Sequence, residues 1–243
     1  MSMKKLYFTK LLGNIEVIIE RKSIKNIRLK VFPSGIVKLS APTGVSDKYL
    51  EDFLKSKTAW IEKSLNFFKD TKAGESETII QSGATTRILG RQIRIIVNEA
   101  KFHRIEQKED CVYIQSPAPK DTQALQKQFG RWWQKQSKSY FLAAIDRLYP
   151  IIAKHGFGKP ELQVRRMKTI WGSCSRRYGK INLNYYLYKA PPPCIDYVVL
   201  HELAHFLYPK HNKVFYDFLT VHMPDWKERK RILDHEIAKE LGN

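Results

Sequence analysis

A pair of histidines four positions apart is the part of this sequence best suited to chemistry. His201 and His205 bracket the string His-Glu-Leu-Ala-His, in which Glu202 follows the first histidine. On a helix, side chains four positions apart lie on one face, so both imidazoles can reach one metal ion. Zinc accepts neutral imidazole nitrogens, and Glu202 can face a zinc-activated water without being a ligand. The string therefore predicts a zinc site with Glu202 as general base.

The residues around this string favour a functional site over an accidental match. The segment from Ile195 to Leu207 is mostly apolar and predicts a short helix. Burying two imidazoles and a carboxylate in such a helix costs free energy unless they have a purpose there, such as a metal ion to bind.

A catalytic zinc requires a third protein ligand and one open position for water. Pro209 disfavours helical geometry at Tyr208, so the helix should end there and the chain should turn. His211 follows this turn and is the favoured third ligand. Its spacing from His205 equals that in the extended HExxHxxGxxH zinc motif, although Tyr208 occupies the glycine position. The alternatives for the third ligand are the downstream carboxylates of Asp217, Asp225 and Glu228.

Several other residues are weaker candidates for chemistry. His222 is expected at a helix end, either as a proton donor or oxyanion stabiliser, or as a surface histidine without a role. Tyr186 and Arg166 are the other candidates for stabilising an oxyanion. Cys174 is interpreted as structural, because a zinc-activated water makes a second nucleophile unnecessary.

The composition is that of a basic globular protein. The chain has 243 residues, of which 43% are hydrophobic, and this is enough for a buried core. Its three cysteines are widely spaced, which argues against a disulfide framework and favours a cytoplasmic location. No long uncharged apolar run and no signal peptide are recognised, so no membrane association is expected. The net charge of +19 makes nucleic acid a candidate partner.

Hydrophobic periodicity predicts two regions, a strand-rich one over 1–117 with one helix and a second one over 118–243 that carries the metal site. In the first, residues 15–39 predict an antiparallel meander, and Ser46 caps a helix that runs to about Phe68. A polar linker over 69–78 precedes four short strands, which are expected over 87–89, 92–97, 102–107 and 111–115.

The second region begins with a long helix over 125–148. Strands are expected over 162–166 and 180–188, with Trp171 and Gly172 in a tight loop between them. The strand over 180–188 should form the rim of the cleft, either with an exposed edge that could pair with an extended peptide or as an interior strand. Helices near 195–207, 212–221 and 226–240 complete the chain.

Three longer runs carry a family resemblance: Arg166–Cys174, Gly179–Asn184 and Ile195–His205, with His211–Phe215 and Pro224–Lys227 fitting the same pattern. Together they resemble the YgjP-like metallopeptidase family, which is similar to the SprT-like and WLM minimal zincins. The resemblance is most specific over 165–227. It implies an α+β fold with a zincin-like core, in which a small antiparallel sheet and a packing helix support the active-site helix. It also supports the three histidines as ligands and Glu202 as base.

The favoured hypothesis is a zinc-dependent metallopeptidase that acts on a peptide or protein substrate. Glu202 would take a proton from water and pass it to the leaving amine. Some members of the family are described as nucleotide phosphohydrolases acting on UTP, whereas the SprT-like relatives cut proteins crosslinked to DNA.

Two other hypotheses remain. One is a metal-dependent nucleotide phosphohydrolase, in which phosphates are held by the six cations Arg165, Arg166, Lys168, Arg176, Arg177 and Lys180, although no glycine-rich phosphate loop is visible. The other is a nucleic-acid-binding module with a structural metal. Three ligands and a free carboxylate argue against it, because structural zinc sites usually have four ligands.

Overall fold

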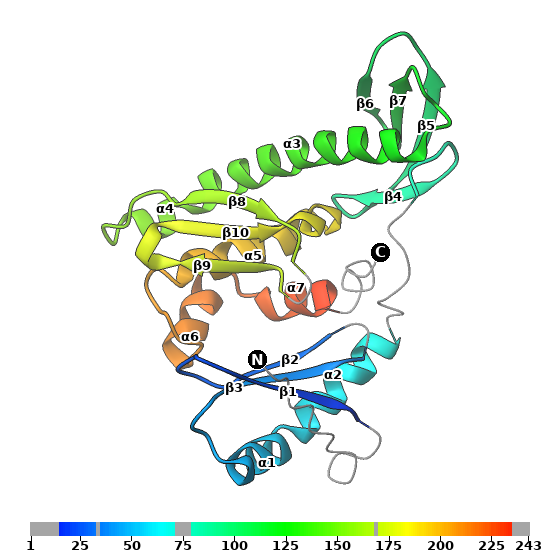
Figure 1. Cartoon of the computed structure of the whole chain (residues 1–243). Helices are drawn as coiled ribbons and strands as arrows, with labels where there is room; N and C mark the ends of the chain where they lie inside the picture. Colours follow the sequence, from blue (N-terminus) through cyan, green and yellow to red (C-terminus); the bar gives the residue numbers. More distant parts are fainter. Residues whose placement is uncertain (1–14, 33–34, 71–78, 168–169, 235–243) are drawn as a thin grey trace. The chain divides into compact units, whose positions relative to one another are not determined.

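The computed structural model describes residues 15–32, 35–70, 79–167 and 170–234, and the chain forms two compact units that divide after residue 75 (Figure 1). Helices and short sheets are mixed, in agreement with the expected α+β class. The boundary expected after residue 117 falls inside the second unit, because the strands that precede it share one hydrophobic core with the helices that follow. Most of the predicted linker over 69–78 lies outside the described residues.

The first unit contains a three-stranded sheet of β1 (Val17–Lys22), β2 (Arg28–Val31) and β3 (Val37–Pro42) in the order β1-β3-β2. β3 pairs antiparallel with β2 but parallel with β1. The predicted antiparallel meander is therefore wrong for β1. Alternation of apolar residues fixes which face of a strand is buried, but it does not fix the neighbour with which the strand pairs.

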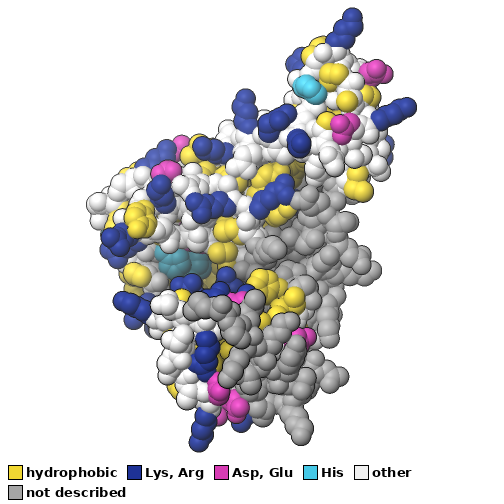
Figure 2. All heavy atoms as spheres, viewed as in Figure 1, with side chains coloured by type: hydrophobic (Ala, Val, Ile, Leu, Met, Phe, Trp, Pro, Cys, Tyr) yellow, Lys and Arg dark blue, Asp and Glu magenta, His cyan; other side chains and the backbone are white. Residues whose placement is uncertain are grey.

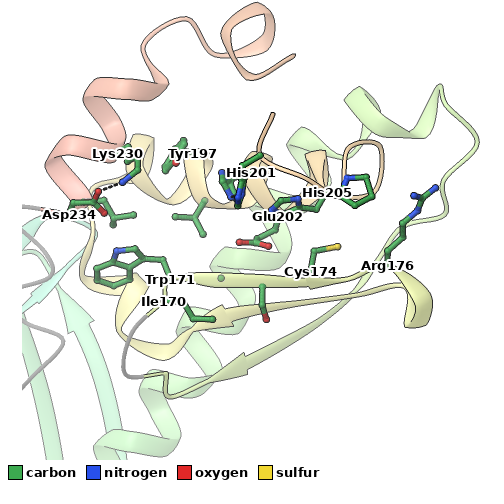
Figure 3. A pocket seen from close by; sticks show the side chains of 16 residues that line it. Ile170, Trp171, Cys174, Arg176, Tyr197, His201, Glu202, His205, Lys230 and Asp234 are labelled. Atoms are coloured by element: carbon green, nitrogen blue, oxygen red, sulfur yellow. Dashed lines mark hydrogen bonds and ion pairs between the residues drawn. The ribbon is translucent and has the colours of Figure 1, made fainter. Parts of the chain in front are cut away.

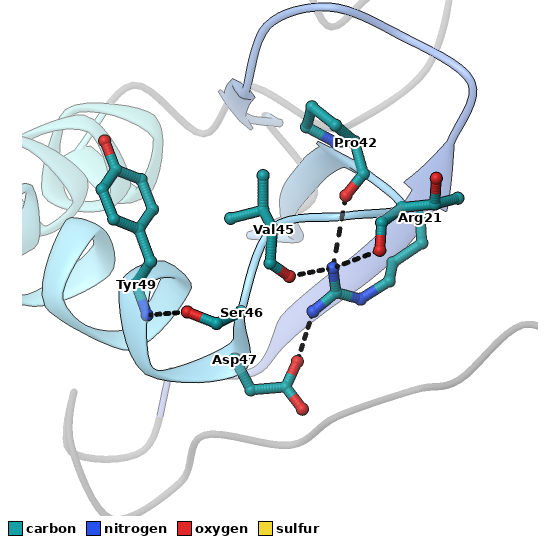
Figure 4. A network of polar contacts seen from close by, with 7 residues as sticks. Arg21, Pro42, Val45, Ser46, Asp47 and Tyr49 are labelled. Atoms are coloured by element: carbon teal, nitrogen blue, oxygen red, sulfur yellow. Dashed lines mark hydrogen bonds and ion pairs between the residues drawn. The ribbon is translucent and has the colours of Figure 1, made fainter.

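The single helix predicted from Ser46 is instead two helices, α1 (Asp47–Ser56) and α2 (Thr58–Asp70), which are separated at Lys57. Both contribute to the core of the first unit. Ser46 does cap α1, because its side chain accepts a hydrogen bond from the Tyr49 amide. Arg21 fixes the approach to this cap: its guanidinium donates to the backbone oxygens of Pro42 and Val45 and pairs with Asp47 (Figure 4).

The second unit begins with a sheet of β4 (Thr85–Ile88), β5 (Arg91–Glu99), β6 (Arg104–Lys108) and β7 (Cys111–Ser116) in the order β4-β5-β7-β6, which confirms the four predicted strands. The turn between β4 and β5 contacts the segment before the metal helix. Leu89 and Gly90 both have positive φ, and their amides donate to the carbonyl oxygens of Tyr188 and Lys189. A Cβ atom on Gly90 would lie 3.1 Å from Pro191, so the backbones approach closely here.

A smaller sheet is formed by β8 (Glu161–Arg165), β9 (Gly172–Ser175) and β10 (Lys180–Asn184) in the order β8-β10-β9. It is mixed rather than antiparallel, because β10 runs parallel to β8. The strand predicted over 180–188 ends at Asn184, whose side chain accepts a hydrogen bond from the Tyr186 amide and starts the 3-10 helix η2 (Tyr185–Lys189). β10 is the central strand, so it offers no exposed edge, and β9 occupies the position predicted as a loop.

The helices of the second unit place the metal motif in the core. They are α3 (Thr122–Leu148), α4 (Pro150–Ala153), α5 (Pro192–Ala204), α6 (Lys213–His222) and α7 (Trp226–Ile232). α5 carries the motif, and Ile195, Val199 and Leu200 on it are fully buried. α3 packs on α5 and is tied to η2 by the indole of Trp133, which donates to the Tyr185 carbonyl at 3.0 Å. No helix in the described ranges is long and apolar enough to cross a membrane.

Candidate metal centre

Three imidazoles converge at the end of α5. His201 lies in its last turn, His205 follows its last residue, and His211 comes from the loop that leads to α6. One nitrogen from each ring lies within 4.8 Å of the others, and the Nε2 atoms of His201 and His211 are 2.9 Å apart. The Nδ1 atom of His205 faces the Tyr208 carbonyl at 3.1 Å, which leaves its Nε2 atom as the one available to a ligand.

Phe215 packs against all three imidazole rings. It is fully buried on α6, and its ring centroid lies 4.8–4.9 Å from those of all three histidines. Asn212 positions it by capping α6, because the Asn212 side chain accepts a hydrogen bond from the Phe215 amide at 3.1 Å. The turn at Pro209 thus returns the chain through His211 to a helix that packs on the motif.

The donor set fits a cation such as zinc. Burial lowers the pKa of His201 to about 3, and burial also lowers the pKa of His211, so both rings are held in the neutral form that binds metals. The Nε2 atoms of His201 and His211 lie 2.9 Å apart, and a neutral ring that binds a metal through Nε2 carries its proton on Nδ1. Neighbouring acceptor nitrogens at such short range are best satisfied by a shared positive ion.

The carboxylates considered as alternative third ligands are engaged elsewhere. Asp217 pairs with Lys213 at 2.7 Å, Asp225 with Arg229 at 2.9 Å, and Glu228 with Arg231 at 2.6 Å. None of these three joins the cluster of histidines in the structure.

Glu202 lies beside this cluster and lines the same cavity as the three histidines. It is only 5% exposed, and burial raises its pKa to about 8. Gly172 on β9 makes room for it: a Cβ atom at Gly172 would lie 2.7 Å from Glu202 Oε1 and 2.8 Å from its Cγ. The spacing of motifs in the sequence does not predict this role of Gly172. Gly172 is the first residue of β9, and a glycine within a strand often marks the close approach of another segment.

A cavity of about 570 Å³ opens onto the histidines and Glu202 between β9 and α5 (Figure 3). Toward α7 its wall combines aromatic and apolar residues with the ion pair of Lys230 and Asp234, and Arg176 lies at the opposite side (Figure 3). The residues that define it beyond the motif include Ile170, Trp171, Arg176, Tyr197, Lys230 and Leu233. With a volume of about 570 Å³, the cavity is large enough to admit part of a larger substrate.

None of the three residues considered for oxyanion stabilisation lines this cavity. His222 packs against the ring of Phe218 at 4.5 Å, and Arg166 lies over Tyr185 at 4.7 Å. Tyr186 also lies outside the cavity, with the Arg166 guanidinium 5.8 Å from its ring centroid.

Tyr197 does line the cavity, one helical turn before His201, with the two rings edge to face at 5.8 Å. Burial raises the pKa of Tyr197 above its usual value, so its hydroxyl stays a hydrogen-bond donor. Its position four residues before His201 was the signal that could have found it.

Cys174 also faces the cavity, from β9 (Figure 3). Burial, together with the nearby Glu202 carboxylate, raises the pKa of the Cys174 thiol to about 12. A thiol that stays protonated at neutral pH is a poor nucleophile, which favours the structural interpretation of this residue.

Asn184 on β10 holds the residues that form one wall of the cavity. It is fully buried, and its Nδ2 atom donates to the carbonyl oxygens of Met167 at 2.8 Å and Ile170 at 2.9 Å. Its backbone amide donates to the carbonyl oxygen of Trp171 at 2.8 Å. These bonds hold the residues that lead into β9, and hence Gly172 beside Glu202.

We expect Asn184→Ala to lower the free energy of unfolding by about 1–3 kcal/mol, because a fully buried side chain is lost and two carbonyl oxygens lose their donor. Urea unfolding measures this loss. Asn182→Ala is the matched control on the same strand, since Asn182 donates only to the part-buried Ser173 hydroxyl. Equal losses in the two variants would contradict a special role for Asn184.

The family model described as "YgjP-like, metallopeptidase domain" matches residues 25–236 of the chain. No match was found among curated proteins.

Proposed function

The chain belongs to the YgjP-like metallopeptidase family, and we propose that it hydrolyses peptide bonds at a single zinc ion held by His201, His205 and His211. The observation that carries this proposal is the convergence of three imidazoles beside a buried carboxylate in an open cavity. Three protein ligands leave a coordination position for water, as catalytic zinc sites require. The proposal includes a zincin-like arrangement, in which α5 supplies both the base and two of the ligands.

Zinc at this position supplies a Lewis acid that lowers the pKa of water and polarises the scissile carbonyl. Glu202 takes the proton from the attacking water and passes it to the leaving amine. Its burial and the glycine opposite keep the carboxylate in place for both transfers. Tyr197, with its protonated hydroxyl in the same cavity, is the proposed donor to the oxyanion.

The sheet beside the cavity favours a peptide as substrate. β9 is the last strand in the order β8-β10-β9, and Gly172, Ser173 and Cys174 on it line the cavity. An extended peptide could pair with this edge and bring a peptide bond to the metal. The pairing with an extended peptide that was considered for residues 180–188 is thus proposed for β9 instead.

The two alternative hypotheses have less support. Of the described cations among the six considered for phosphate binding, only Arg176 lines the cavity. A structural zinc would be expected to have four protein ligands, whereas the histidine cluster has three and Glu202 is not part of it. A nucleotide phosphohydrolase and a structural metal module are therefore not favoured.

We expect removal of the metal to abolish hydrolysis of a denatured protein substrate and readdition of zinc to restore it. Metal content by mass spectrometry should be one zinc per chain. His211→Ala should weaken zinc binding by more than about 100-fold, because one of three ligands is lost. His222→Ala, which alters a half-buried histidine outside the cavity, is the matched control and should bind zinc normally.

Undiminished proteolysis by the metal-free protein would refute the zinc hypothesis. Hydrolysis of UTP in the absence of any peptide hydrolysis would replace it with the phosphohydrolase alternative.

A further inference from the structure

A row of cations runs along one face of α3, away from the metal centre. Lys127, Arg131, Lys135 and Lys138 follow one another at intervals of four, four and three residues, so they share one face of the helix. All four are exposed. Figure 2 shows Lys and Arg side chains gathered over this part of the second unit.

Little of the charge of this face is neutralised locally: Lys180 pairs with Glu161 at 2.9 Å and is the main cause of the lowered pKa of that carboxylate, to which Lys138 contributes less. From Thr122 to Ile145 the helix contains no Asp or Glu. The acid that follows, Asp146, pairs with Lys159. Within the described ranges, none of the four cations forms an ion pair with a carboxylate. Such a face produces a positive potential that attracts polyanions.

The same face borders a groove of about 590 Å³. Lys127 and Arg131 lie on its helical side, and Gly130 between them leaves the space that a side chain would fill. Arg166 lies on the other side, with its guanidinium 4.7 Å from the ring centroid of Tyr185 and 5.8 Å from that of Tyr186. The groove and the metal cavity have no lining residue in common.

We propose that this groove, defined by Lys127, Gly130, Arg131, Arg166 and Tyr185, binds single-stranded nucleic acid. Cations one helical turn apart are spaced by about 6 Å along α3, so they can follow the successive phosphates of one strand. A positively charged groove combined with aromatic rings and an arginine plane is typical of sites for single strands, where bases stack and phosphates pair. The proposal goes beyond the hydrolytic function and does not depend on it.

A single row of cations also distinguishes a single strand from a duplex. A duplex presents two phosphate backbones separated by a groove, and it would require cations in two rows on a broader surface. The groove beside α3 has one row of cations along the helix, and the single cation opposite, Arg166, lies over the rings of Tyr185 and Tyr186. It is therefore matched to one backbone.

The test is fluorescence anisotropy of a labelled oligothymidylate with the zinc-loaded full chain and with the triple variant Lys127→Gln, Arg131→Gln, Lys135→Gln. We expect the triple variant to bind about 100-fold more weakly at about 0.1 M salt, because three phosphate contacts are lost. The slope of log K against log salt should fall by about 2. Peptide hydrolysis should not change, since these residues lie outside the metal cavity.

The matched control removes three positive charges elsewhere in the second unit, with Lys101→Gln, Lys108→Gln and Lys154→Gln, all of them exposed. It should retain most of the affinity. Equal loss in the control would show that net charge alone attracts the strand, and that result would overturn the proposal. Polyglutamate that competes as well as the oligonucleotide would also overturn it, in favour of an acidic polypeptide as the partner.

Discussion

Glu202→Gln is expected to reduce kcat for peptide hydrolysis by at least about 1,000-fold while zinc binding stays unchanged. The amide has nearly the size of the carboxylate, so it fits the space opposite Gly172, but it cannot accept a proton from water. Because Glu202 is not one of the three clustered ligands, the variant should contain the same amount of zinc as the wild type. Steady-state kinetics and metal analysis on the same preparation test both parts.

Cys174→Ser is the matched control for this variant, because Cys174 lines the same cavity and its raised pKa makes it a poor nucleophile. It should retain activity within a few-fold. A fully active Glu202→Gln enzyme would exclude Glu202 as the base. An inactive Cys174→Ser enzyme that still binds zinc would point to covalent chemistry instead.

Gly172→Ala is expected to lower kcat by about 100-fold with normal zinc content. The added Cβ would lie 2.7–3.0 Å from three atoms of Glu202, which is closer than such atoms approach in proteins. Either the carboxylate or β9 must move, and a displaced base transfers protons poorly. The variant should also lose about 1–3 kcal/mol of unfolding free energy through overpacking.

Gly158→Ala is the matched control for this substitution. A Cβ atom at Gly158 would meet no atom within 4 Å. Its activity and its stability should therefore be close to those of the wild type. If Gly172→Ala were as active as Gly158→Ala, the close approach would have no catalytic importance.

The elements that depend on local patterns could be predicted from the sequence. The apolar stripe of α3 and the apolar run of α5 predicted both helices, since burial of a helical face leaves a clear period. The turn at Pro209 predicted that His211 would return toward His201, and the structure brings the two rings together. Short-range rules were sufficient in these cases.

The contacts that depend on pairing between distant segments could not be predicted. Alternation in β1 did not reveal its parallel pairing with β3. β9 has four small residues, Gly172 to Ser175, which lack the β-branched side chains that indicate a strand. Its role beside Glu202 therefore became visible only in three dimensions. The same is true of Phe215, which looks like an ordinary core residue of a helix.

Two turns of the sheet β4-β5-β7-β6 should differ in how well they tolerate inserted residues. The turn between β4 and β5, at Leu89 and Gly90, is hydrogen-bonded to the residues just before α5 and leaves no space at Pro191. The turn between β6 and β7, at Glu109, is exposed. An inserted peptide tag or a new pair of chain termini should be tolerated at Glu109, because exposed turns absorb insertions, whereas one at Gly90 would shift the helix that carries the metal motif.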